Sequence, residues 1–181
     1  GGGAAAATYP DGVTLADGVT LSALEADGWT IVYQVRYGDS TTTSLVDSWR
    51  AAAGPNLSLV FVGAADSSGN ITIGATGLAN EVLTQTASST LASAYSSSNL
   101  YWYNVPGLSI GFTPTQGISL NSADITGIYT PDDGHNALRL SWHLSGGGGW
   151  RAGALATLTD AHTPQKVVLV KSDPVGDFDG D

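Results

Sequence analysis

The chain has 181 residues, of which 42% are hydrophobic and only 12% are charged, and its 16 acidic and 6 basic residues give a formal charge of -10. This composition is too apolar for a disordered chain, and the negative charge excludes nucleic acid and anionic membrane surfaces as favoured partners. No cysteine is present, so neither a disulfide bond nor a thiolate metal site can form. No apolar run approaches the about 20 residues that span a bilayer, so we expect no membrane span.

The composition also predicts the domain organisation. Gly, Ser, Thr and Ala are abundant, which is typical of a sheet protein with tight turns. We expect one β-sandwich domain over residues 11–172, preceded by a low-complexity segment, 1–10, and followed by an acidic tail, 173–181. At the start of this domain the sequence Asp-Gly-Val-Thr-Leu occurs twice, at 11–15 and 17–21. Two copies are too few for a solenoid, so they predict a small hairpin of two short strands.

The clearest strand lies at residues 28–39. Its apolar residues recur at every second position, which predicts a half-buried antiparallel strand with one apolar face. That face carries Trp29, Ile31, Tyr33, Val35 and Tyr37.

A short helix is predicted next, over residues 44–53, with Ser44 as its N-cap and Gly54-Pro55 as its end. Strands at 57–63 and 71–73 then form a hairpin across a Ser-Ser-Gly-Asn turn. Residues 86–99 are rich in Ser, Ala and Thr and are either a weak helix or a long loop.

The second half of the chain contains further short strands separated by turn residues. The apolar residues of 137–144 alternate, with Leu138, Leu140, Trp142 and Leu144 predicted to face inward, and this strand is expected to pair with the strand at 28–39. The spacing of about ten residues predicts an all-β fold, an antiparallel β-sandwich or jelly-roll-like body with one or two short helices. The remaining predicted strands are 101–103, 108–112, 118–120, 125–129 and 166–171.

No catalytic constellation is found in the sequence. The three histidines, His135, His143 and His162, have no partner at metal-ligand spacing, and no Gly-x-Ser-x-Gly motif is present. The only glutamates are Glu25 and Glu81, so the paired carboxylates of a glycosidase would have to be largely aspartates. We therefore predict a protein that is not an enzyme.

Aromatic residues are the best candidates for ligand binding. An aromatic ring exposed in a loop can stack on a sugar or anchor a protein partner, whereas Trp29 and Trp142, at alternating strand positions, are predicted core residues. Trp150 follows four glycines and is expected at a loop mouth. The candidate ligand-binding residues are Tyr101, Trp102, Tyr103, His143, Trp150 and Arg151.

The acidic tail carries a candidate metal site. Asp177, Asp179 and Asp181 alternate with other residues, as carboxylates do in the first half of a calcium loop. The pattern resembles the start of a dockerin-like or EF-hand-like repeat, which implies bound calcium and a natural protein that continues past Asp181. The alternative is a frayed acidic tail without a ligand.

Several segments resemble extracellular fibrinogen-related and intelectin-like domains. Residues 27–36, Asp-Gly-Trp-Thr-Ile-Val-Tyr-Gln-Val-Arg, with Asp39 and Trp49 downstream, are similar to the opening of the fibrinogen-related family. Residues 78–83 are similar to its Gly-Asn-Glu segment, and 148–150 to its later Gly-Trp stretch. Residues 140–153 also resemble the glycine-rich ends of intelectin-like and other secreted surface proteins. The resemblance implies calcium-assisted binding of glycans or proteins outside the cell. The disulfides of that family have no counterpart here, and the nearest counterpart of its acidic calcium motif, Asp132 and Asp133, has a different spacing.

Two functions follow from these observations. The first is an extracellular or cell-surface structural or adhesive subunit that self-assembles into a filament, coat or appendage, so that the chain is a homo-oligomer or polymer. In it, a terminal segment would add a strand to a neighbour's sheet edge. The alternative is a fibrinogen-like or lectin-like module that binds a glycan or surface protein near a calcium ion.

Overall fold

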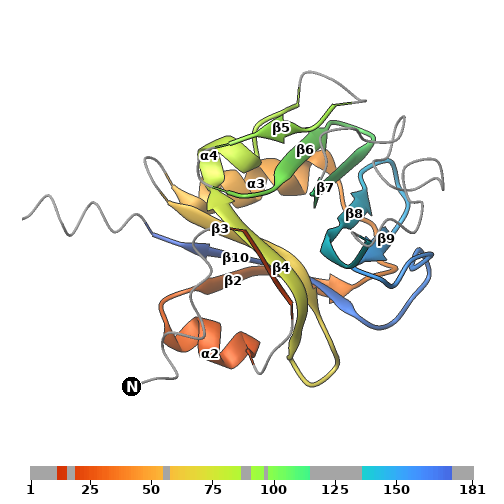
Figure 1. Ribbon diagram of the computed structural model, residues 1–181, viewed down its shortest axis with the longest axis horizontal. Coiled ribbons are helices and arrows are strands. Elements are labelled where there is room, and N and C mark those ends of the chain that lie inside the picture. Colours follow the sequence, from red (N-terminus) through yellow and green to blue (C-terminus); the bar gives the residue numbers. More distant parts are fainter. Residues whose placement is uncertain are drawn as a thin grey trace, which may run out of the picture.

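The computed structural model describes residues 12–15, 19–54, 58–86, 91–95, 98–114 and 136–172. These residues form two five-stranded antiparallel sheets and three short α-helices (Figure 1). The predicted all-β, sandwich-like fold is therefore confirmed, with one helix more than expected. No helix in the described ranges has both the length and the apolar character needed to cross a membrane.

The first sheet has the order β1-β4-β3-β10-β2, with every neighbouring pair antiparallel. Strands β3 and β4 form the hairpin predicted around the Ser-Ser-Gly-Asn turn. Strand β3 is buried along nearly its whole length, because helices cover both faces of this sheet. The strands are β1 (Gly12–Leu15), β2 (Thr30–Arg36), β3 (Leu59–Ala65), β4 (Ile71–Leu78) and β10 (Gln165–Lys171).

The second sheet has the order β5-β6-β7-β8-β9, again antiparallel throughout. Strands β6 and β7 are joined at Pro106-Gly107, the predicted turn. A 3-10 helix, η1 (Asn136–Leu138), precedes β8. The strands are β5 (Ser93–Ala94), β6 (Tyr101–Val105), β7 (Ser109–Thr113), β8 (Leu140–His143) and β9 (Gly149–Ala152).

The helices are α2 (Leu21–Ala26), α3 (Thr43–Ala53) and α4 (Ala79–Val82). The predicted helix at 44–53 is α3, which ends at Gly54 with a positive φ of 89°. The predicted N-cap was wrong. Thr42, with extended backbone, accepts the Leu45 N–H through its hydroxyl, while Ser44 lies within the helix.

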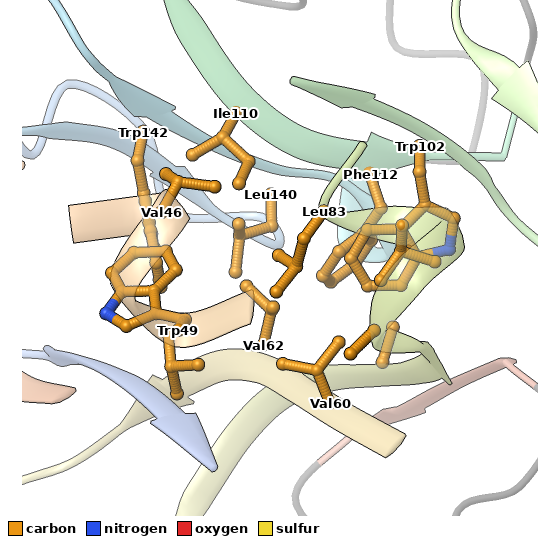
Figure 2. Close-up of a cluster of buried hydrophobic side chains, with 14 of the residues drawn as sticks. Val46, Trp49, Val60, Val62, Leu83, Trp102, Ile110, Phe112, Leu140 and Trp142 are labelled. Carbon is orange, nitrogen blue, oxygen red and sulfur yellow. The ribbon is translucent and has the colours of Figure 1, made fainter. Parts of the chain in front are cut away.

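The main hydrophobic core lies between the two sheets and is shared with α3 and α4. Figure 2 shows Val60 and Val62 of β3 facing aromatic residues of the second sheet, with Trp49 of α3 at one side. The ring centroids of Trp49 and Trp142 are 6.1 Å apart in an edge-to-face arrangement. One continuous core therefore joins the two sheets through α3.

A second hydrophobic cluster lies on the opposite face of the first sheet, beneath α2. Leu24 of this helix packs with Trp29 and Phe61, whose ring centroids are 6.2 Å apart. Trp29 is 4% exposed and Trp142 is 0% exposed, so both are core residues as predicted.

The predicted single apolar face of the strand at 28–39 was wrong. Ile31 pairs with Leu169 and Tyr33 with Val168, so Val32 has no partner on β10 and forms a β-bulge. The bulge reverses the alternation. Trp29 and Ile31 pack under α2, whereas Val32 and Tyr33 pack in the main core.

The repeated Asp-Gly-Val-Thr-Leu motif does not form a hairpin. Its first copy contains β1, which pairs with β4. In the second copy, Val19 is buried and Thr20 is the N-cap of α2, where its hydroxyl accepts the Ala23 N–H at 3.0 Å. The same five-residue sequence adopts two structures because only the second copy is followed by a helix-forming sequence.

Strand β8 does not pair with β2, contrary to prediction. It lies between β7 and β9 in the other sheet, while β10 is the partner of β2. Leu140, Trp142 and Leu144 are buried as expected, but Arg139 and Ser141, predicted to face outward, are also buried. Both faces of β8 are therefore covered.

Several predicted features lie wholly or partly outside the described residues. In the stretch 86–99, the described residues include β5 and no helix. The other predictions concern the strands at 118–120 and 125–129, the terminal segments 1–10 and 173–181, and Asp132, Asp133 and His135.

Candidate functional site

The predicted aromatic residues are not gathered on one exposed surface. Trp102 and Tyr103 are 0% exposed, and the Tyr103 hydroxyl donates to the Leu140 carbonyl at 2.8 Å. Tyr101 is half-buried and packs beside Tyr103. Arg151 is 6% exposed, and its Nη1 donates to the Gly153 carbonyl at 3.0 Å. In this structure Trp102, Tyr103 and Arg151 are core residues and present little surface to a ligand.

His143 and Trp150 are the two predicted residues that do lie together with partial exposure. They belong to the neighbouring strands β8 and β9, and their ring centroids are 6.5 Å apart in an edge-to-face arrangement. Burial lowers the pKa of His143, and the positive charge of Lys166 lowers it further. Neither residue lines the recess described next, which the sequence did not reveal.

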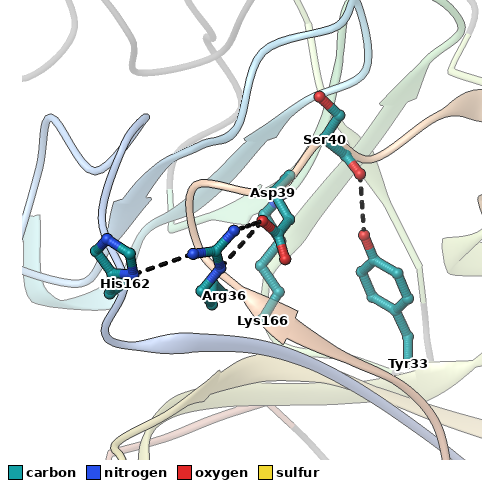
Figure 3. A network of polar contacts seen from close by, with 6 residues as sticks. All are labelled: Tyr33, Arg36, Asp39, Ser40, His162 and Lys166. Carbon is teal, nitrogen blue, oxygen red and sulfur yellow. Dashed lines mark hydrogen bonds and ion pairs between the residues drawn. The ribbon is translucent and has the colours of Figure 1, made fainter.

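The recess lies between the end of β2 and the loop that leads into β10. It has a volume of about 170 Å³ and is open to solvent. Its lining is mostly polar, and Figure 3 shows three of the side chains. The lining residues are Arg36, Gly38, Asp39, Asp160, Ala161 and His162.

Three side chains of the recess fix one another. Arg36 donates from Nη2 and Nε to Asp39 Oδ1 at 2.9 and 3.2 Å, and its Nη1 lies 3.1 Å from His162 Nδ1 (Figure 3). Because a guanidinium can only donate, His162 Nδ1 accepts and the ring proton is on Nε2. The hydrogen bond from Arg36 holds the pKa of Asp39 below its usual range. The recess thus has a set of polar groups in place before any ligand arrives.

The backbone around the recess is closely packed and depends on glycine. Gly38 donates its N–H to the Ala161 carbonyl at 2.8 Å. A Cβ on Gly148 would lie 2.5 Å from the Thr159 carbonyl oxygen and 2.8 Å from Gly38 Cα. Gly148 therefore brings the turn between β8 and β9 against Gly38, one of the lining residues of the recess.

Lys166 of β10 supports the recess from the core side. Its side chain is 0% exposed, and Nζ donates to the Asp39 carbonyl and, at 2.7 Å, to Thr41 Oγ1. Thr41 Oγ1 is also 2.8 Å from the Tyr33 hydroxyl. Burial lowers the pKa of Lys166 to about 8, although the charge of Asp39 opposes this shift. The hydrogen bonds of the buried amine therefore connect residues 39–41, which follow β2, to the first sheet.

A second buried network joins the end of β2 to the other sheet. The Tyr37 hydroxyl donates to the Arg151 carbonyl at 2.6 Å and accepts the Trp142 indole N–H at 2.8 Å. Burial raises the pKa of Tyr37. The recess is thus held by both sheets, which makes it a rigid part of the fold.

Nothing in the described ranges forms a metal centre, because no three His, Asp or Glu side chains there come close enough to hold an ion. The predicted calcium ligands Asp177, Asp179 and Asp181 lie outside those ranges. The recess presents two carboxylates, an imidazole and a guanidinium, which together can accept and donate hydrogen bonds.

Sequence reasoning missed the recess because its two sides are far apart in the chain. Arg36 and His162 are separated by 126 positions. The polar stretch before Pro164 was the only local sequence signal of the recess. No protein-family model, curated protein or solved structure matches this chain.

Proposed function

We propose that this chain is a non-enzymatic adhesive module of the extracellular or cell-surface space that binds a glycan in the recess between the end of β2 and the loop that leads into β10. The observation that carries the proposal is the set of polar groups that Arg36, Asp39 and His162 hold in place around an open recess. Groups fixed before binding lose little conformational entropy when a ligand arrives. The resemblance to fibrinogen-related and intelectin-like domains points to the same class of ligand.

A sugar suits the chemistry and the size of the recess. Hydroxyl groups both donate and accept, so they can satisfy the carboxylates of Asp39 and Asp160 and the Nε2–H of His162 together. The volume of about 170 Å³ is smaller than the roughly 300–1,000 Å³ of sites for drug-sized ligands. We therefore expect the recess to hold a single sugar residue. Calcium binding by Asp177, Asp179 and Asp181 stays a separate prediction for the same module.

Retention on a glycan array tests the proposal. Asp39→Asn removes the carboxylate that orients Arg36, and we expect it to weaken binding by about tenfold, the effect of losing one charged hydrogen bond. Asp47→Asn is a matched control, because Asp47 and Arg50 are also an exposed pair three residues apart, at 3.6 Å on α3. The proposal fails if the wild-type protein retains no glycan, or if both variants retain it equally.

Self-assembly is the second candidate, and strand β1 favours it. This four-residue strand lies at the edge of the first sheet, directly after the N-terminal segment, and pairs with β4. The same strand of a neighbouring copy could occupy that position on β4. Against this candidate, the charge of -10 opposes self-association.

The edges at β2 and β9 are less suited to strand addition. Strand β2 carries the bulge at Val32, which disrupts the ladder that an added strand would need. Strand β9 is bonded to the following loop, with Ala152 N–H donating to the Leu155 carbonyl at 2.8 Å and Leu158 N–H to the Trp150 carbonyl at 3.1 Å. Light scattering tests the candidate: a polymer that deletion of residues 1–15 converts to monomer supports exchange of β1, and a monomer at every concentration contradicts it.

A further inference from the structure

We infer that the recess selects ligands that carry a positively charged amine next to hydroxyl groups, in preference to neutral or anionic polyols of the same size. This inference rests on the proposed function, and it names the chemical class of the ligand. It follows from how the charges in the recess are paired. Asp160 is the residue that determines the preference.

The positive charge of Arg36 is already matched within the recess. Its guanidinium bonds twice to Asp39 Oδ1, at 2.9 and 3.2 Å, so these two charges offset each other. Its remaining contact is with His162 Nδ1, which must accept and therefore carries no proton. His162 in this arrangement is neutral and adds no positive charge.

Asp160 is left without a partner. Its side chain is exposed at the recess, and among the described residues it forms no hydrogen bond or ion pair. The other nearby cation, Lys166, is buried on the core side, where its amine bonds to the Asp39 carbonyl and Thr41 Oγ1. The solvent side of the recess therefore has one unmatched negative charge, and the chain's charge of -10 adds a long-range attraction for cations.

An ammonium group on the ligand supplies the missing partner. Hydroxyl groups next to it can bond to Asp39 and to the Nε2–H of His162, as proposed for a sugar. Because the Asp160 pair would be exposed, it contributes modestly, and we expect about threefold tighter binding of the amine than of the neutral polyol. An anionic ligand would be repelled. Both differences should shrink in concentrated salt, which screens exposed charges.

Three probes that share one carbon chain test the inference: glucamine, which is cationic at neutral pH, glucitol, which is neutral, and gluconate, which is anionic. Binding is followed through the backbone amide NMR signals of Gly38 and Ala161, which lie in the recess and share a hydrogen bond of 2.8 Å. The variants are Asp160→Asn, and Asp47→Asn as a control that removes the same charge from the exposed face of α3.

The expected order of affinity is glucamine, then glucitol, then gluconate, in the wild-type protein and in Asp47→Asn. Asp160→Asn should bring glucamine and glucitol to within about 1.5-fold of each other. Equal affinities in the wild-type protein, or an order unchanged by Asp160→Asn, would overturn the inference even if pyranose sugars bind. If glucamine shifts the recess amides and no pyranose does, the charge inference stands and the glycan function fails. No shift with any of the three probes overturns the inference, and no shift with pyranose sugars as well overturns the glycan function too.

Discussion

Replacing Lys166 with methionine should remove a pH dependence of stability that the buried amine imposes on the wild-type protein. The pKa of Lys166 is lowered from 10.5 to about 8 in the folded chain, chiefly by burial. Between these two values the unfolded chain binds more protons than the folded chain, so raising the pH stabilises the fold. Integrated from about pH 7 to about pH 9.5, the free energy of unfolding should rise by about 2 kcal/mol from this group.

The pH window has an upper limit set by tyrosine. Burial raises the pKa of Tyr33 and Tyr37 in the folded chain, so these groups lower stability once the unfolded chain starts to lose tyrosine protons, near pH 10. Measurements should therefore stop at about pH 9.5. Within the window, only the difference between wild-type and variant proteins is needed, because the other titrating groups are common to both.

Urea denaturation at several pH values measures the effect. Wild-type protein should gain about 2 kcal/mol over the window relative to Lys166→Met. Lys171→Met is the matched control, because Lys171 lies at the partly exposed end of the same strand, with Nζ 3.4 Å from Asp27 Oδ2. This control should keep the wild-type rise. Parallel pH curves for wild type and Lys166→Met would refute the reasoning that the amine is buried and ionised at neutral pH.

Two further substitutions test the packing around the recess and the start of α3. Gly148→Ala should lower the free energy of unfolding by about 1–3 kcal/mol, because its Cβ would lie 2.5 Å from the Thr159 carbonyl oxygen, and the loss should show in the urea midpoint. Gly147→Ala should cost less, since its nearest contact is a side chain at 3.3 Å; equal losses would contradict this packing. Thr42→Ala should cost about 1 kcal/mol in thermal denaturation and Ser44→Ala little, and the reverse order would contradict the observed cap.

Features encoded by neighbouring residues could be predicted from the sequence. The hairpin of β3 and β4 follows a Ser-Ser-Gly-Asn turn, and β6 and β7 flank Pro106-Gly107. Helix α3 ends at Gly54, as its sequence indicates. In each case the signal lies within a few residues, where turn and cap preferences act directly on the backbone.

Features that depend on distant partners could not be predicted in the same way. The bulge at Val32 exists because β2 pairs with β10, and no residue of β2 alone signals an extra position. The partner of β2 was predicted to be the strand containing Trp142, because both strands alternate well. Alternation identifies a strand that has one covered face, but it does not select which strand lies beside it.

Buried polar side chains were the second source of error. Alternation in β8 predicts that Arg139 and Ser141 face water, yet both are buried. Lys166 was predicted at the end of a strand and is instead fully buried, where it bonds to the loop that covers it. A polar residue in a strand can be covered whenever a loop supplies hydrogen-bond partners. Whether a loop lies there depends on the tertiary structure.

The candidate site also combines residues that the sequence identified with residues that it could not identify. The sequence identified His143 and Trp150, which contact each other with partial exposure but do not line the recess. It also offered Trp102 and Tyr103, which are core residues, because an aromatic run in a strand carries no local signal of exposure. His162 was considered for metal binding alone, since its contact with Arg36 spans 126 positions.

The most direct test of the recess as the recognition site is a map of backbone amide chemical shifts during titration with a panel of pyranose monosaccharides. We predict that a binding sugar shifts the amides of residues 36–39 and 160–162 first, with smaller changes at Gly148 and Trp150. Shifts centred on the far end of the second sheet, around Tyr101, would contradict the account, as would a panel that leaves residues 36–39 and 160–162 unchanged.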